Sequence, residues 1–265
     1  MLIGFCQIQS QREKEFAYFP KTCPVNSYIL LNIIQAYFHF YPVIMNYIVK
    51  IIEIQQVTHD VKYFRTEKPL GYEFLPGRAT DLSINKPGFE DEKRPFTFTA
   101  LTSEFYLEFT IKRYPDHHGV TDKLHQLQIG DELIISDSWG AIDYKGPGVF
   151  IAGGAGITPF IAILRNLFHE KKITGNKLFF SNKTSADIIY EKELKMILGN
   201  NAVFILSRDK NDLFAHGRID KNFLENNIRD FSSHFYVCGP DSMVQEIVKT
   251  LGELGASTDA LIFEK

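Results

Sequence analysis

One stretch of the chain, residues 146–168, constrains the fold more than any other part. It reads GPGVFIAGGAGITPFIAILRNLF: a short apolar strand, a glycine-rich turn, and a helix with apolar residues at helical spacing. Glycines in the turn at residues 153–159 remove Cβ atoms that would hold a diphosphate away from the backbone, and the helix that follows directs free N–H groups at such an anion. We expect Thr158 to be the N-cap of this helix and Pro159 its first residue. The stretch therefore predicts a strand–turn–helix unit suited to a nucleotide diphosphate.

The turn differs from the dinucleotide fingerprint G-x-G-x-x-G at one position. Pro159 stands where the third glycine would be. Glycine turns of this kind also occur as ordinary tight connections. The turn alone therefore does not decide between a nucleotide site and a structural role.

Composition narrows the class of protein. The chain has 265 residues, enough for one large domain or two of ordinary size. A net charge of −3 and the lack of any basic run indicate that nucleic acid is not a partner. Cys6, Cys23 and Cys238 lie far apart, so their spacing predicts no metal site and no disulfide framework. We expect a protein of the reducing cytoplasm.

Residues 22–49 contain no Asp, Glu, Lys or Arg and are long enough to cross a bilayer. Polar residues and a proline within the stretch oppose a membrane span, and a signal peptide is disfavoured because the apolar run starts late. Three interpretations stay open. Met45 is the functional start and the preceding residues are an upstream extension, or the stretch anchors the protein in a membrane, or it packs on the fold as an extra segment.

Two different patterns divide the rest of the chain. Between residues 45 and 145, β-branched and aromatic runs separated by turn signals favour a small closed barrel of six strands with one short helix. From residue 146 onward, strands alternate with helices, which predicts a parallel sheet covered on both faces, with ligands at the carboxyl ends of the strands. The predicted domains are an N-terminal extension at 1–44, a barrel at 45–145 and an α/β domain at 146–265.

The expected barrel strands are 47–56, 61–66, 77–83, 96–102, 106–114 and 132–137, with the short helix at 122–127. The expected strands of the α/β domain are 149–152, 177–181, 202–207 and 234–238. Its expected helices are 159–171, 190–198, 221–226 and 241–254.

Three further short motifs carry chemistry. Arg94 opens a barrel strand and offers a fork for a phosphate, although an edge arginine beside a core phenylalanine is the common structural reason for such a residue. The sequence G-V-T at 119–121 leads into a helix, so it is either a second diphosphate turn or an ordinary capped helix. The sequence C-G-P at 238–240 ends the last predicted strand, where ligands bind, but an isolated buried cysteine is usually structural. His117 and His118 are expected to be a solvated loop pair, because no third metal ligand lies nearby in the sequence.

In their order and spacing, the motifs R-x-F-T, G-V-T, G-G-A-G-I-T-P and C-G-P resemble those of the ferredoxin–NADP reductase family, in its compact flavodoxin-reductase-like branch. The resemblance extends over residues 45–265. It implies a six-stranded antiparallel FAD-binding barrel followed by a parallel-sheet nucleotide-binding α/β domain. It also implies an FAD-dependent NAD(P)H oxidoreductase.

On the flavin side, the resemblance assigns Arg94 to the FAD pyrophosphate and Thr97 to the region of flavin N5. Phe96 stands where the family usually has a tyrosine against the flavin. It has no hydroxyl for the ribityl chain, so weaker FAD retention is expected. The other FAD contacts implied are backbone groups of Ile111 and Lys112, and the turn of Gly119, Val120 and Thr121.

On the nicotinamide side, the resemblance assigns the cofactor diphosphate to Gly153, Gly154, Gly156 and Thr158. Cys238 would stand beside the nicotinamide, with Gly239 and Pro240 following it. Phe263 would cover the flavin until the nicotinamide displaces it. The charges expected near the adenine ribose favour NADPH over NADH, and the residues concerned are Lys183, Ser207, Arg208 and Arg218.

No iron–sulfur, haem or oxygenase motif accompanies these flavin motifs in the sequence. We therefore expect electrons to pass to a separate small protein such as ferredoxin or flavodoxin, and the reductase to be a monomer. Two alternatives stay open. One is a membrane-associated ferric or quinone reductase anchored through residues 22–49, and the other is a non-catalytic binding module that kept the fold and lost the flavin.

Overall fold

The computed structural model describes residues 45–115, 119–140, 142–210, 212–257 and 261–263, and residues 45–265 form one compact unit. The expectations for residues 1–44 and for His117 and His118 lie outside the described residues. Among the residues described, no helix combines the length and the apolar composition needed to cross a membrane.

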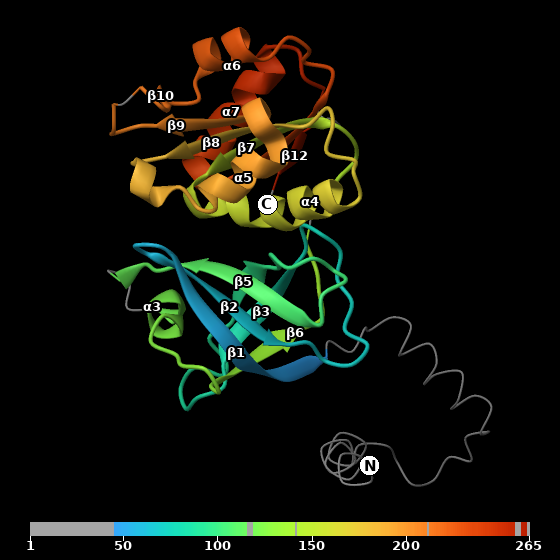
Figure 1. Cartoon of the computed structure of the whole chain (residues 1–265), viewed down its shortest axis with the longest axis vertical. Helices are drawn as coiled ribbons and strands as arrows, with labels where there is room; N and C mark the ends of the chain where they lie inside the picture. The colour runs from blue at the N-terminus through green and yellow to red at the C-terminus, as the bar shows by residue number, and fades with distance from the viewer. Residues whose placement is uncertain (1–44, 116–118, 141, 211, 258–260, 264–265) are drawn as a thin grey trace, which may run out of the picture. The chain divides into compact units, whose positions relative to one another are not determined.

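The N-terminal part of this unit is an antiparallel sheet of six strands in the order β4-β3-β6-β1-β2-β5 (Figure 1). An isolated bridge between Phe98 and Phe109 joins the chain after β4 to β5, so the sheet curves into a nearly closed barrel. The strands are β1 (Asn46–Thr58), β2 (Val61–Glu67), β3 (Ala79–Ile84), β4 (Arg94–Thr97), β5 (Tyr106–Lys112) and β6 (Glu132–Ser136).

Apolar side chains from all sides fill the barrel. Phe64, Phe98 and Phe109 are fully buried there, since alternate residues of a strand point to the same face. Helix α3 (Val120–Leu124) adds Val120 and Leu124 to the same core. The short helix therefore belongs to the barrel.

The C-terminal part is a parallel sheet of six strands in the order β10-β9-β8-β7-β11-β12. Its strands are β7 (Gly148–Gly153), β8 (Lys177–Asn182), β9 (Ala202–Leu206), β10 (Ala215–His216), β11 (His234–Cys238) and β12 (Leu261–Phe263). The chain runs outward from β7 to β10 and then returns to β11 on the other side of β7. Strand order therefore reverses between β7 and β11, and in such sheets ligands bind at the carboxyl ends beside the reversal.

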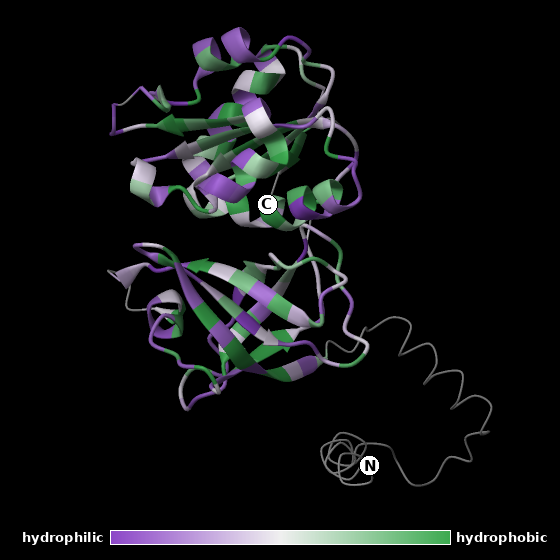
Figure 2. Cartoon of the chain, viewed as in Figure 1, coloured by the Kyte–Doolittle hydropathy of each residue, from purple (hydrophilic) through white to green (hydrophobic). Residues whose placement is uncertain are grey.

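Helices cover both faces of this sheet (Figure 1). Helices α4 (Thr158–His169) and α5 (Glu191–Leu198) pack on one face in a single apolar cluster with Phe150, Phe180 and Tyr236. Helices α6 (Lys221–Asn227) and α7 (Asp241–Glu253) pack on the other face. Figure 2 shows that the strands and α4 carry mainly hydrophobic residues, as expected of elements covered by others.

The predicted fold class, an antiparallel barrel followed by a parallel α/β sheet, is confirmed. The strand predicted at 96–102 is wrong in its bounds, because β4 ends at Thr97. The Phe98 N–H donates to Arg78 O at 3.1 Å, whereas the Thr99 N–H donates to Glu108 O at 2.8 Å. The chain thus crosses from the β3 side to the β5 side within two residues and leaves the ladder.

The prediction that Thr158 caps α4 is also wrong. A 3₁₀ turn, η3 (Gly154–Ile157), runs directly into the helix, so Ile157 is the N-cap and Thr158 is already helical. The extended residue that an N-cap requires is found before the turn, at Gly153, with φ −124° and ψ 113°.

Candidate cofactor-binding site

The glycine turn after β7 packs directly against the turn after β11. A Cβ on Gly156 would overlap the Cys238 carbonyl oxygen, and one on Gly153 would overlap the Met243 sulfur. A Cβ on Gly239 would lie 3.1 Å from the Gly153 nitrogen. The two predicted motifs therefore meet at the reversal of strand order, and Gly156 is required there because two backbones approach closely.

Gly154 differs from these three glycines. It has φ +53°, in the left-handed region, and a Cβ built on it would meet no atom within 4 Å. The first turn of α4 carries no acidic residue. The outer side of the turn is therefore open backbone at the positive end of a helix dipole, which is the chemistry that binds a diphosphate.

Cys238 closes β11 at the same edge of the sheet. It is 5% exposed and belongs to the apolar cluster under α4. β12 lies next to β11 and pairs Phe263 with Val237 through the backbone, while the Phe263 side chain lies outside the described parts. The roles expected for Cys238 and Phe263 beside the nicotinamide and flavin stay predictions.

On the barrel side, Thr97 ends β4 with a buried hydroxyl that has no hydrogen-bond partner. A buried polar group without a partner costs free energy, so its presence calls for an explanation. Phe96 is half-buried and packs on the barrel core. Arg94 is exposed and donates to the Lys93 carbonyl at 2.7 Å and to Glu92 at 3.2 Å.

The strand predicted to contact the flavin ring, β5, makes polar contacts through both its backbone and its side chains. The Ile111 carbonyl oxygen accepts a hydrogen bond from His125 Nε2 at 2.8 Å. Lys112 forms a 2.8 Å ion pair with Asp60. Gly119 is the N-cap of α3, with no side-chain cap, and Val120 and Thr121 form the first turn. A G-V-T turn into a helix, as predicted, is therefore present.

Of all buried side-chain polar atoms in the described ranges, only those of Thr97 and Asn182 lack a partner. Asn182 ends β8, is 6% exposed, and leaves both its amide oxygen and its amide nitrogen unpaired. Sequence reasoning missed this residue. The rule that ligands bind at carboxyl ends of parallel strands is the signal that could have found it.

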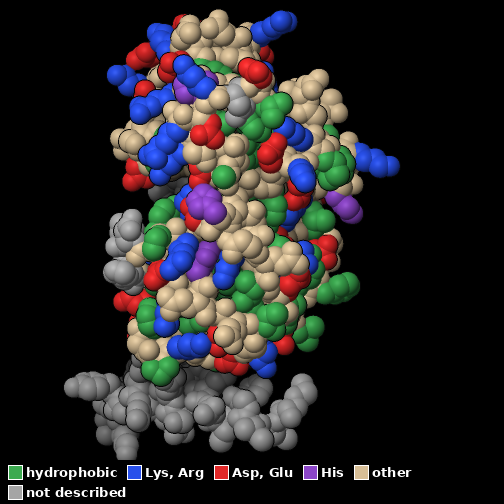
Figure 3. All heavy atoms as spheres, turned by 60° about the vertical axis from the view of Figure 1, so that its left-hand side comes forward, with side chains coloured by type: hydrophobic (Ala, Val, Ile, Leu, Met, Phe, Trp, Pro, Cys, Tyr) green, Lys and Arg blue, Asp and Glu red, His purple; other side chains and the backbone are tan. Residues whose placement is uncertain are grey.

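The cations predicted to favour NADPH over NADH lie around the ends of β8 and β9. The Arg208 N–H donates to Lys183 O at 2.9 Å, and the Gly217 N–H donates to Leu206 O at 2.9 Å. Lys183, Ser207, Arg208 and Arg218 are all exposed. None of the three cations forms an ion pair with a described residue. In Figure 3, Lys and Arg side chains lie over the upper part of the molecule with Asp and Glu side chains among them.

One further cluster contains possible metal ligands. His59, Asp60 and Asp187 lie near one another, between the β1–β2 turn and the short helix η4 (Ser185–Asp187). Lys112 Nζ lies 2.8 Å from Asp60 Oδ2, and Asp187 Oδ2 accepts from the Thr184 N–H and hydroxyl. Lys112 therefore already supplies the positive charge that this cluster binds.

A barrel followed by a parallel sheet with an open glycine turn at its reversal point is an architecture suited to binding a nucleotide diphosphate. Residues 150–249 match the oxidoreductase NAD-binding domain family. The match covers the α/β part of the chain, and the similarity to a solved ferredoxin NADP⁺ reductase shows that the chain has the fold expected from the resemblance.

The relatives and solved structures to which the chain is similar include several reductases. The reductase component of propane 2-monooxygenase from Rhodococcus jostii is 28% identical over 82% of this chain and 62% of its own length. NADH-cytochrome b5 reductase 2-A from Vanderwaltozyma polyspora is 28% identical over 79% of this chain and 80% of its own. A ferredoxin NADP⁺ reductase from Neisseria gonorrhoeae, solved with bound FAD and NADP, has a TM-score of 0.72 at 20% identity, covering 83% of this chain and 98% of that one. The chain spans about three fifths of the length of the oxygenase reductase component.

Proposed function

We propose that the protein binds FAD on the barrel and NAD(P)H at the glycine turn, and passes electrons from the nicotinamide through the flavin to a separate acceptor protein. The unpartnered buried hydroxyl of Thr97 carries this proposal. By the resemblance of its motif, Thr97 would stand near flavin N5, and a bound flavin would supply the missing partner. When bound, FAD supplies the exchange between two-electron and one-electron chemistry.

The chain's own contribution is binding and orientation. Thr97 would hold the reactive edge of the flavin by one hydrogen bond, and the Ile111–Lys112 backbone would hold the edge of the ring. Arg94 would exchange its exposed contact with Glu92 for the FAD pyrophosphate, which the amides of Gly119, Val120 and Thr121 would also bind. Phe96 would pack on the ring but leave one hydrogen bond unmade, which weakens FAD binding by about 0.5–1.5 kcal/mol.

The nicotinamide cofactor would occupy the edge between β7 and β11. The open backbone of Gly154 and the start of α4 would bind its diphosphate, with Gly153, Gly156 and Thr158 forming the turn. Cys238, Gly239 and Pro240 would exclude water from the nicotinamide. Phe263 would cover the flavin when the nicotinamide is away.

We propose NADPH as the preferred reductant, because Lys183, Arg208 and Arg218 are exposed cations at the expected 2′-phosphate position. Arg208→Ala should lower the ratio of kcat/KM for NADPH over that for NADH by about tenfold, the loss of one charge-assisted hydrogen bond. Lys50→Ala, an exposed cation on β1 of the barrel, is the matched control. An unchanged ratio in Arg208→Ala would overturn the NADPH preference.

The acceptor we propose is ferredoxin or flavodoxin. The relatives that act as oxygenase reductase components support an acceptor on a separate protein. Steady-state reduction of a purified ferredoxin and a purified flavodoxin, compared with free ferricyanide, measures this directly. Reduction of ferricyanide but of neither protein would remove both from consideration.

The central experiment is the visible spectrum of the purified full chain with FAD added in excess and then removed by gel filtration. Retained flavin absorbance that anaerobic NADPH bleaches is the expected result. A chain that retains no FAD would contradict the proposal. Retained FAD that neither NADPH nor NADH bleaches would indicate the non-catalytic binding module.

A further inference from the structure

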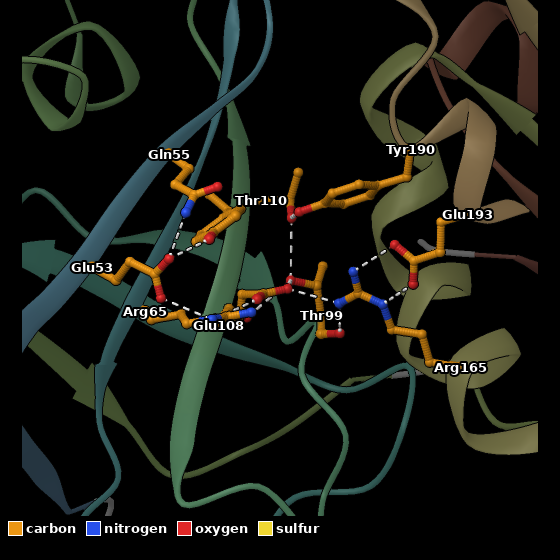
Figure 4. Close-up of polar contacts among 10 residues, drawn as sticks. Glu53, Gln55, Arg65, Thr99, Glu108, Thr110, Arg165, Tyr190 and Glu193 are labelled. Carbon is orange, nitrogen blue, oxygen red and sulfur yellow. Dashed lines mark hydrogen bonds and ion pairs between the residues drawn. The ribbon is translucent and has the colours of Figure 1, made fainter. Parts of the chain in front are cut away.

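Two side chains from the α/β helices reach the barrel strands (Figure 4). Arg165, on α4, donates from Nη1 to the Thr99 carbonyl oxygen at 2.6 Å and to Glu108 Oε1 at 2.7 Å. Its Nε and Nη2 donate to the two carboxylate oxygens of Glu193, on α5, at 2.6 and 2.9 Å. Four of the five N–H groups of the guanidinium are thus committed to one geometry.

Glu108, on β5, fixes the barrel end of this contact. It is 2% exposed and also accepts from Arg65 Nε at 2.9 Å and from the Thr99 hydroxyl at 2.9 Å. Arg65 in turn forms a 2.8 Å ion pair with Glu53. Charges of alternating sign therefore run from the barrel strand β1 to helix α5, and hydrogen bonds to charged groups away from water resist displacement.

Tyr190 makes a second contact between the same two parts. Its hydroxyl lies 3.1 Å from the Thr110 hydroxyl, and its ring lies under the Arg165 guanidinium at 4.9 Å. Tyr190 is the N-cap of α5 and has φ +54°, a left-handed conformation that residues with a side chain rarely adopt. Residues in such conformations persist where surrounding contacts hold them, as these contacts do here.

These contacts lie close in sequence to both proposed cofactor sites, the flavin site on the barrel and the nicotinamide site at the glycine turn. Thr99 lies two residues after Thr97, and Thr110 directly precedes Ile111. Arg165 lies two turns along α4 from the glycine turn. Hydride transfer requires reacting atoms about 3–3.5 Å apart, and a misplacement of about 1 Å can reduce the rate by about 100-fold.

We propose that Arg165 and Tyr190 are positioning residues that hold the flavin-binding strands of the barrel at a fixed distance from the nicotinamide turn. This inference rests on the proposed function. Neither residue contacts a cofactor position. They act through Thr99 and Thr110, so their loss should disturb the alignment of the two rings without weakening the binding of either cofactor.

The test uses Arg165→Lys, Arg165→Gln and Tyr190→Phe in the FAD-loaded full chain. Anaerobic stopped-flow gives the flavin reduction rate at saturating NADPH and the NADPH concentration for half-maximal rate. We expect Arg165→Gln to lower the saturated rate by about 100-fold and Tyr190→Phe by about tenfold. Arg165→Lys, which keeps one donor, should restore part of the loss. FAD retention and half-saturation should stay within about threefold of wild type.

A second readout involves no turnover. Adding NADP⁺ to the oxidised FAD-loaded chain gives a visible difference spectrum that reports contact between the two rings. Its amplitude at saturation should fall in Arg165→Gln and Tyr190→Phe, while its midpoint stays unchanged. Lys195→Gln is the matched control, because its 2.7 Å ion pair with Glu191 lies within α5.

Wild-type saturated rates and amplitudes in Arg165→Gln, or in Arg165→Lys and Tyr190→Phe where Arg165→Gln does not fold, would overturn the inference. A change confined to FAD retention or to half-saturation would overturn it as well. A wild-type chain that binds no FAD would instead count against the proposed function, so the two failures are distinguishable.

Discussion

At the scale of single residues, removing the unpartnered hydroxyl of Thr97 should have opposite effects on stability and on activity. Thr97→Val removes a buried unsatisfied group, so without FAD it should leave the free energy of unfolding unchanged or raise it by up to about 1 kcal/mol. With FAD bound, the same change should slow flavin reduction. Urea unfolding and stopped-flow reduction measure the two effects.

Thr99→Val is the matched control for Thr97→Val. The Thr99 hydroxyl is bonded to Glu108 at 2.9 Å and lies 3.1 Å from the Thr110 hydroxyl. Its removal leaves a buried partner unsatisfied and should cost about 1–3 kcal/mol of unfolding free energy. If both variants lost the same stability, the Thr97 hydroxyl would have a partner after all.

His125 predicts how stability depends on pH. Burial is the largest cause that lowers its pKa from the ordinary value of 6.5, and the nearby charges of Lys62 and Arg113 also lower it, while the hydrogen bond to Ile111 and the charge of Asp60 oppose them. Below about pH 6.5 the unfolded chain therefore takes up a proton that the folded chain resists, and stability falls as the pH is lowered.

His125→Gln keeps a donor for the Ile111 carbonyl oxygen but does not titrate. The wild type should therefore lose more unfolding free energy than this variant between about pH 7.5 and pH 5.5, as measured by urea unfolding at each pH. His169→Gln, at an exposed position, is the matched control. Equal losses in wild type and His125→Gln would remove this residue as a source of the pH dependence.

At the scale of elements, the contact between the turns after β7 and β11 predicts which glycines tolerate a methyl group. Gly156→Ala places a Cβ into the Cys238 carbonyl oxygen and should cost about 1–3 kcal/mol, because two backbones must separate. Gly252→Ala, in α7, meets no atom within 4 Å and should stabilise by about 0.5–1 kcal/mol. Urea unfolding of both variants checks the opposite signs, and destabilisation by Gly252→Ala would show that the free space is absent.

Elements with a clear repeating pattern were predictable from the sequence. Strands β7 and β8 and helix α4 were expected close to their observed bounds, because their apolar runs are bounded by glycine or polar residues. β10 (Ala215–His216) and β12 (Leu261–Phe263) were missed, since two or three residues are too few for a periodic signal. The wrong end of β4 has a different cause. Phe98 and Thr99 look like strand residues, but their N–H groups donate to partners on opposite sides.

At the scale of the whole molecule, the motifs of the candidate site could be predicted but the network that joins them could not. Each motif is local in sequence, so a short run of residues is enough to find it. Arg165 and Glu108 are 57 residues apart, and each alone reads as a surface charge. Only the close approach of α4 to β5 makes them a partly buried ion pair, and sequence periodicity does not report that distance.

The ion pair between Arg165 and Glu108 predicts how the molecule unfolds. Trp139 is the single tryptophan and exchanges two backbone hydrogen bonds with Ala79 of the barrel, so its fluorescence follows the barrel. Far-UV circular dichroism is dominated by the helices around the parallel sheet. Because Glu108 binds Arg65 and Arg165 at once, we expect both signals to share one unfolding midpoint in the wild type.

Glu108→Gln removes the buried carboxylate that two partly buried guanidinium groups share, and this should cost about 1.5–3 kcal/mol. The loss falls on the contact between barrel and sheet, so the two midpoints should separate, with fluorescence and circular dichroism no longer superimposing in urea. Glu170→Gln, which breaks an exposed 2.8 Å pair with Lys172, should leave the unfolding free energy nearly unchanged and keep the midpoints together. Coincident midpoints in Glu108→Gln would mean that apolar packing alone couples the two parts.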